Sequence, residues 1–134
     1  IMFQKPGIFN SSFQDNILID RDQKSKELDF GRLISQLDLT DLKKNYDNKN
    51  LKLQTNDPRL SGGEKQRIGF SRAAMQKSDI YIFDEPTSAL DVERKKRVAD
   101  IIRQICENKI VLLISHDDLL FDQNELNIID LSDE

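Results

Sequence analysis

A chain of 134 residues can enclose one hydrophobic core, and its net charge of −4 with 33% charged residues provides no basic field that would draw it to nucleic acid or acidic lipid. The longest apolar run, residues 110–114, has the length of a strand and not of a membrane span. The single cysteine, Cys106, has no disulfide partner and follows Ile105 in a helical pattern, so we expect a reducing compartment and a packing role.

Residues 1–17 predict a strand end, a turn and a short helix. Residues 1–3 are typical of the end of a strand, so we expect the chain to be part of a longer domain. The turn follows at residues 5–7, where Pro6 fixes φ and Gly7 frees it. Ser12, with Asp15 three positions later, predicts a capping pair at the start of a helix that ends at residue 17.

Residues 24–59 predict two helices and an exposed loop. Apolar residues recur at helical spacing over residues 24–37, which indicates an amphipathic helix. Thr40 is a candidate N-cap for a short helix ending at residue 44 or 45. Residues 46–59 are polar and close on Asp57 and Pro58, so we expect them to form a loop with little regular structure.

A turn of small residues, Ser61, Gly62 and Gly63, precedes a helix predicted over residues 64–76. Small residues leave the backbone N–H groups uncovered, and the positive end of the helix dipole lies at the same point. Such an end can bind an anion, although an ordinary N-cap and turn would have the same sequence.

The second half of the chain alternates strand and helix. A buried strand is predicted at residues 80–83, a helix at 92–107, an apolar strand at 110–114 and a last strand at 127–131. Parallel strands joined by a helix form an α/β sheet, and the apolar strand should be covered on both faces. We therefore expect a helical subdomain over residues 12–76, with residues 1–4 and 77–134 in an α/β core.

Two motifs together carry a resemblance to a known family. Residues 60–67 read LSGGEKQR and residues 80–91 read IYIFDEPTSALD. In this order and spacing they resemble the signature motif, Walker B strand and D-loop of an ATP-binding cassette (ABC) ATPase, and residues 8–17 are similar to ABC exporters. The resemblance extends from Gln4 to His116. It implies an incomplete P-loop NTPase-type parallel sheet with flanking helices and a helical signature subdomain.

The resemblance implies roles for four residues in hydrolysis of a nucleotide γ-phosphate. Asp84 would hold Mg²⁺, usually through water, and Glu85 would polarise the attacking water as general base. Gln4 would touch the metal or the water, and His116 would contact the γ-phosphate. Without the resemblance, each has an ordinary alternative: a turn acid, a solvated carboxylate, a loop glutamine or a structural histidine.

The resemblance also implies a site shared between subunits. ABC domains pair head to tail, so Ser61, Gly62 and Gly63 would bind a γ-phosphate held by the partner, and Gln66 of the same motif is assigned to cofactor binding. Asp91 would be the D-loop aspartate at that boundary, although an acid capping the next helix would look identical. The expected partners are a second nucleotide-binding domain and, near residues 4–17, the membrane domain of a transporter.

The chain lacks a phosphate loop of the form Gly-x-x-x-x-Gly-Lys-Ser/Thr, since the pair Gly-Lys does not occur in it. We therefore expect this chain alone to be soluble, inactive and a poor ATP binder, with an open sheet edge and exposed apolar surface that favour self-association. In the parent protein it would use ATP and Mg²⁺ to drive export, at the cytoplasmic face of the cell membrane.

Two other kinds of protein are alternatives to an ABC transporter. A chromosome-maintenance or repair ATPase has a similar signature, but Pro86, Thr87 and Ser88 match the transporter form, the insertion is too short for a long coiled coil, and basic stripes for DNA are absent. The second alternative is a non-catalytic interaction module, a half-domain that binds a partner but no nucleotide. A phosphate loop upstream in the parent sequence would distinguish that class from an enzyme.

Overall fold

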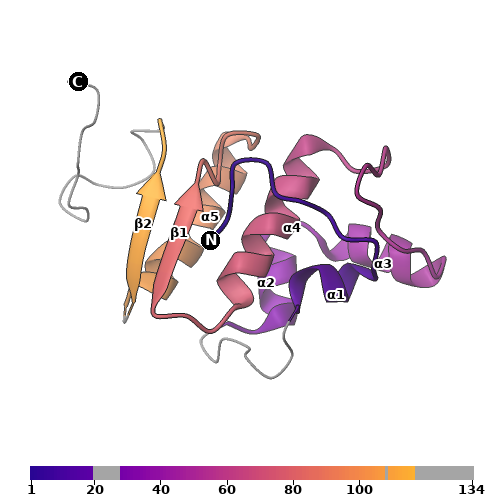
Figure 1. Ribbon diagram of the computed structural model, residues 1–134, viewed down its shortest axis with the longest axis horizontal. Helices are drawn as coiled ribbons and strands as arrows, with labels where there is room; N and C mark the ends of the chain where they lie inside the picture. Colours follow the sequence, from indigo (N-terminus) through magenta and orange to yellow (C-terminus); the bar gives the residue numbers. More distant parts are fainter. Residues whose placement is uncertain (20–27, 108, 117–134) are drawn as a thin grey trace.

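The computed structural model describes residues 1–19, 28–107 and 109–116 (Figure 1). The strand predicted at residues 127–131 lies outside this part of the chain. The elements are α1 (Phe13–Ile17), α2 (Phe30–Gln36), α3 (Thr40–Asn48), α4 (Gly62–Met75), β1 (Ile80–Asp84), α5 (Val92–Cys106) and β2 (Ile110–Ile114). None of the helices in these described ranges is long and apolar enough to span a bilayer.

The two strands form a small parallel sheet, as the strand–helix–strand pattern predicted. Ile80 lies opposite Ile110, and Asp84 lies opposite Ile114. On the other edge of β1, Met2 forms a parallel bridge, in which its N–H donates to the Ile82 carbonyl at 2.8 Å and its carbonyl accepts from the Asp84 N–H at 3.0 Å. The predicted α/β class is confirmed by this sheet with its crossover helix α5.

Helix α4 is the central element, with the sheet on one side and α1, α2 and α3 on the other (Figure 1). Its Phe70 packs against Phe83 of β1, with ring centroids 5.1 Å apart. On another side of α4, a Cβ added to Gly69 would lie 2.2 Å from Pro6 Cβ, so only glycine allows the Pro6 turn to lie on this helix. Helix α4 therefore fixes both the sheet and the segment that leads to α1.

The N-terminal half of the chain differs from the prediction at two helix ends. Helix α2 begins at Phe30 because Asp29 is its N-cap and accepts from the Arg32 N–H at 2.8 Å. The helix predicted over residues 24–37 is therefore wrong at residues 28 and 29, and its first four residues lie outside the described part of the chain. At α3, Leu39 is the N-cap and makes no side-chain capping bond, so the N-cap assigned to Thr40 is wrong.

Helix α3 also continues past its predicted end. It runs to Asn48 and buries Tyr46, which was predicted to lie in an exposed loop. The Tyr46 hydroxyl donates to the buried Asp57 carboxylate at 2.9 Å. This contact anchors the last turn of the helix, which the local sequence alone does not specify.

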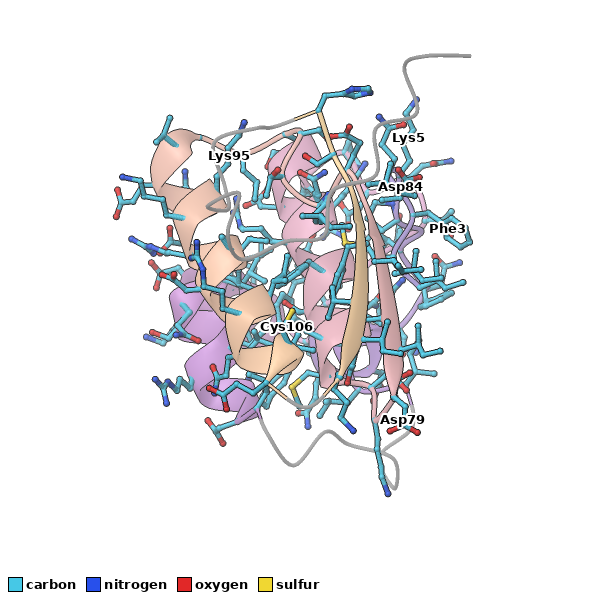
Figure 2. All side chains as sticks on the ribbon, turned by 90° about the vertical axis from the view of Figure 1, so that its left-hand side faces the viewer. Phe3, Lys5, Asp79, Asp84, Lys95 and Cys106 are labelled. Carbon is cyan, nitrogen blue, oxygen red and sulfur yellow. The ribbon has the colours of Figure 1, made fainter. Side chains whose placement is uncertain are left out.

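One face of the sheet is covered by helices and the other is not. Ile110, Leu112 and Ile114 are 60%, 52% and 55% exposed, so the prediction that β2 is covered on both faces is wrong for the described residues. Figure 2 shows Phe3 on the side of the sheet away from α5. Exposed apolar surface was predicted, and this face provides it. Cys106 is exposed at the end of α5, which corrects its predicted packing role.

Candidate functional site

The signature turn caps the N-terminus of α4. The Ser61 hydroxyl accepts from the Glu64 N–H at 3.2 Å, and the Glu64 carboxylate accepts from the Ser61 N–H at 2.7 Å, which forms a capping box. The helix therefore begins at Gly62, earlier than the predicted residue 64. A Cβ at Gly62 would meet nothing within 4 Å, whereas one at Gly63 would lie 3.1 Å from the Ala89 carbonyl oxygen. Gly62 faces open space, and Gly63 allows close contact with the turn that follows β1.

Glu85 and His116 meet at the ends of the two strands. The Glu85 N–H donates to the Ile114 carbonyl at 2.8 Å, which continues the pairing of β1 with β2. The Glu85 carboxylate accepts from the His116 N–H at 3.1 Å, and the imidazole Nε2 lies 3.7 Å from the same oxygen. The Glu85 side chain is buried, while the His116 side chain is 98% exposed. The geometry thus holds a buried carboxylate beside an accessible imidazole.

Asp84 and Gln4 lie at the same end of the sheet. The pairing of Met2 with β1 brings the N-terminal segment alongside Asp84, and Gln4 follows two residues later with an exposed side chain. Figure 2 shows Asp84 and Lys5 near one end of the sheet and Asp79 at the other. Among the described residues, the Asp84 carboxylate has no hydrogen-bond or ion-pair partner, so it is free to bind a cation.

The side chains at this end of the sheet could supply only a few of the ligands of a cation, so water or phosphate would supply the others. In the described ranges, no three His, Cys, Asp or Glu side chains gather to hold a metal ion. The Asp84 carboxylate and the Gln4 amide offer oxygen atoms, which Mg²⁺ prefers, and this ion usually retains several waters and binds phosphate oxygens as well. The residues therefore fit a Mg²⁺ shared with a nucleotide.

The Gln66 side chain lies inside the protein and not on the surface beside the signature turn. Its side chain is 3% exposed. The Nε2 group donates to the Glu85 carbonyl at 2.7 Å and to the Ser88 hydroxyl at 2.9 Å, and Oε1 accepts from the Ala89 N–H at 2.9 Å. This placement disfavours the predicted contact of Gln66 with a nucleotide. Sequence reasoning had no signal for these contacts, because they join residues that are far apart in the chain.

Asp91 is the N-cap of α5. The sequence allowed this interpretation as well as a place at a subunit boundary. The Asp91 carboxylate accepts from the Arg94 N–H at 3.0 Å and also pairs with the Arg94 guanidinium. The N–H of Arg94 is the main reason that the pKa of Asp91 is lowered. Because Asp91 is exposed, the capping role leaves its predicted place at a subunit boundary open.

A buried cluster that sequence reasoning missed anchors the chain just before the signature turn. Asp57, which is fully buried, accepts from the Tyr46 hydroxyl and from Arg59 Nε and Nη2 at 2.9, 2.7 and 2.6 Å. These Arg59 hydrogen bonds are the main cause that lowers the pKa of Asp57 to about 2. Burial, followed by the hydrogen bond to Asp57, raises the pKa of Tyr46 to about 12. The loop predicted at residues 46–59 is therefore fixed at its end.

An open groove of about 440 Å³ lies over the segment that joins Pro6 to α1. It is lined by Phe9, Ser11, Asp15, Leu18 and Ile19.

Helix α4 supports this groove through Arg72. The Arg72 guanidinium lies 4.4 Å from the centre of the Phe9 ring, and its Nε donates to the Asn16 carbonyl at 2.6 Å. Burial lowers the pKa of Arg72 to about 10. The buried Asn16 side chain in turn accepts from the Phe9 N–H at 2.8 Å. The helix that begins at the signature turn thus also supports the groove.

Comparison with known proteins places this arrangement in a family. The chain is 38% identical over 117 residues to the beta-(1→2)glucan export ATP-binding/permease protein NdvA of Bartonella quintana, a match that covers 86% of this chain and 19% of the relative. It is 34% identical over 134 residues to the mating factor M secretion protein mam1 of Schizosaccharomyces pombe, with 96% and 10% covered. The chain therefore spans about a fifth of the first relative and a tenth of the second.

A solved structure has the same fold. A bacterial Atm1-family ABC exporter with ATP bound superposes with a TM-score of 0.68 at 26% sequence identity, over 86% of this chain and 20% of that one. The family model described as ABC transporter matches residues 1–88. Since that match covers most of the chain and includes the signature turn and the end of β1, the chain belongs to the ABC transporter family.

Proposed function

We propose that this chain is the C-terminal part of a nucleotide-binding domain that couples ATP binding and hydrolysis to export. The observation that carries the proposal is the contact between Glu85 and His116, at the end of the sheet where β1 finishes with Asp84. The two reported relatives are an export and a secretion protein, which favours a transporter over the chromosome-maintenance alternative.

Glu85 is the proposed general base. Its carboxylate is buried and accepts a hydrogen bond from the His116 N–H at 3.1 Å, while the His116 imidazole is exposed and can contact a γ-phosphate. A carboxylate so placed can polarise a water molecule and accept its proton as the water attacks phosphorus. His116 then orients the base through its backbone and the phosphate through its side chain.

Asp84 and Gln4 are the proposed residues for Mg²⁺. Both offer oxygen atoms near the end of β1, and the Asp84 carboxylate is unpaired among the described residues. When bound, Mg²⁺ would neutralise negative charge on the phosphate oxygens. Asp84 would hold the ion near Glu85, because the two residues are adjacent in the chain where β1 ends.

The signature turn is proposed to bind the γ-phosphate of a nucleotide held by a second nucleotide-binding domain. Gly62 faces open space at the N-terminus of a 14-residue helix, where N–H groups and the helix dipole favour an anion. Ser61 and Gly63 complete this turn, and Asp91 is exposed near the same boundary. In a head-to-tail dimer, the second domain would supply that phosphate.

The groove beside α1 is the proposed contact with a membrane domain. Phe9, Leu18 and Ile19 supply an apolar lining and Asp15 an acidic group, which together suit a short amphipathic segment. This contact would hold the protein at the cytoplasmic face of the membrane. Arg72 links the groove to the helix that carries the signature turn.

The proposal is tested by ATP hydrolysis in the full-length protein that contains this segment. Replacing Glu85→Gln removes the base and keeps the size of the side chain, so we expect kcat to fall at least about a hundredfold, within the usual range for general-base catalysis. Glu107→Gln is the matched control, because Glu107 is exposed beyond α5. Equal activity of the Glu85 variant and the wild type would refute the assignment.

A further inference from the structure

We propose that Gln66 is a positioning residue that sets the orientation of Glu85 and couples it to the signature helix. The inference rests on the proposed function, since it concerns the base of that reaction. The buried Gln66 amide forms three hydrogen bonds to the turn at residues 85–89, and all three come from helix α4.

Glu85 needs external support because its backbone is in an unfavourable conformation. Its φ of 50° lies in the left-handed region that residues other than glycine seldom adopt. Hydrogen bonds to its N–H and to its carbonyl hold it there. The N–H donates to the Ile114 carbonyl at 2.8 Å. The carbonyl accepts its shortest hydrogen bond from Gln66 Nε2 at 2.7 Å, and two longer ones from the Ser88 N–H and hydroxyl at 3.4 and 3.3 Å. The direction of the Glu85 side chain therefore depends on Gln66 as well as on the sheet.

Glutamine meets the requirements of this position better than related side chains. The site asks for a donor toward the Glu85 carbonyl and an acceptor for the Ala89 N–H, and the amide provides both. Glutamate has the right length but no donor, and methionine has neither group. Because Gln66 is 3% exposed, no water can easily replace a lost hydrogen bond.

The coupling to the signature turn follows from the position of Gln66 in α4. Gln66 lies in the second turn of the helix that begins at Gly62. Gly63 makes a second close approach to the same segment, since its Cβ position would be 3.1 Å from the Ala89 carbonyl oxygen. A phosphate that moves the start of α4 must therefore also move the turn that holds Glu85. In this arrangement, one chain's signature turn sets the geometry of that same chain's base.

The test uses ATP hydrolysis by the full-length protein with Gln66→Met and Gln66→Glu, and Gln54→Met as the matched control in an exposed loop. We expect kcat, measured well below the thermal midpoint of unfolding, to fall at least tenfold in both Gln66 variants, while KM for ATP changes less than threefold. The midpoint itself should also fall in both, because the turn at residues 85–89 loses buried hydrogen bonds. The control should keep wild-type kcat. A merely structural residue would not give this separation of kcat from KM in protein that is still folded.

Two results would overturn the inference. One is a kcat within twofold of wild type in Gln66→Met when Glu85→Gln is inactive. This result would support Glu85 as the base and refute the role proposed for Gln66. The other is a rise in KM for ATP as large as the fall in kcat in both folded Gln66 variants, which would make Gln66 a general stabiliser of the domain. Full activity of Glu85→Gln would instead refute the proposed function itself.

Discussion

At the scale of single residues, the segment ahead of the signature turn depends on a buried carboxylate. Asp57 is fully buried and accepts hydrogen bonds from both Tyr46 and Arg59, whose guanidinium also lies 5.0 Å from the centre of the Tyr46 ring. Hydrogen bonds to a charged group contribute about 1.5–3 kcal/mol each. The cluster thus stabilises the last turn of α3 and the approach to Ser61 together.

We predict that Asp57→Asn lowers the free energy of unfolding by about 1.5–3 kcal/mol at pH 7. Because the folded-state pKa of Asp57 is lowered to about 2 from 3.8, this stabilisation is present above about pH 4 and is lost as the pH falls towards 2. Urea unfolding at several pH values should show wild type and variant converging in acid. Asp41→Asn, at an exposed position, should cost less than about 1 kcal/mol, and an equal cost at both sites would contradict this account.

Two glycines of α4 should respond oppositely to alanine. A Cβ at Gly69 would lie 2.2 Å from Pro6 Cβ, so we predict that Gly69→Ala displaces the Pro6 turn and costs about 1–3 kcal/mol. A Cβ at Gly62 meets nothing within 4 Å, so Gly62→Ala should keep or slightly raise stability. Chemical denaturation of the two variants compares them directly. Equal stability would show that the Pro6 contact is not tight.

At the scale of elements, an ion-pair cluster joins the end of α2 to α5. The Asp38 carboxylate pairs with Arg97 at 2.5 Å and with Arg94 at 3.2 Å, and these side chains are about one third exposed. Exposed pairs contribute little because water screens them and both side chains lose freedom. Asp38 itself has a φ of 51°, which asparagine tolerates as well as aspartate.

We predict that Asp38→Asn costs less than about 1 kcal/mol at low salt and nothing measurable in about 1 M salt. The substitution keeps the backbone preference, so it isolates the effect of the charge. Thermal unfolding at the two salt concentrations measures the difference. A loss above about 2 kcal/mol that persists in high salt would mean that the helices are joined by a desolvated network instead.

The elements that sequence reasoning predicted well are those with a strong local signal. A capping residue indicated the start of α1 at Ser12, and the spacing of apolar residues indicated the parallel strands and the crossover helix. The end of α3 was missed because it depends on the contact between Tyr46 and Asp57, which are 11 positions apart. Local propensity does not carry such a contact.

In the candidate site, too, some contacts could be predicted from the sequence and others could not. Glu85 and His116 could be expected to meet, since each follows the carboxyl end of a parallel strand. The role of Gln66 could not be expected, because its hydrogen bonds to Glu85 and Ala89 connect α4 to a distant turn. The motif therefore identified the residue, and only the three-dimensional contacts indicate what its side chain does.

At the scale of the whole molecule, the open apolar face of the sheet should drive self-association. It is formed by exposed residues of both strands and the N-terminus: Ile1, Phe3, Ile80, Ile110, Leu112 and Ile114. Contiguous exposed apolar surface of this kind favours contact with other molecules.

We predict that the 134-residue chain associates with rising concentration and that Leu112→Glu shifts it towards the monomer, because a charge in the centre of the face opposes burial. Light scattering over a concentration series measures this. Leu51→Glu, at a less exposed position in the loop after α3, is the control and should leave association unchanged. A wild-type chain that remains monomeric at high concentration would contradict the prediction.

We propose that this chain supplies residues that hold the metal, polarise the water and contact the γ-phosphate of a nucleotide that is bound mainly by other parts of the protein. Calorimetric titration of ATP·Mg into the monomeric Leu112→Glu chain, with the full-length protein as the comparison, measures where the affinity lies. We expect a dissociation constant weaker than about 1 mM for the chain and micromolar binding by the full-length protein. Saturable micromolar binding of ATP·Mg by the isolated chain would contradict it.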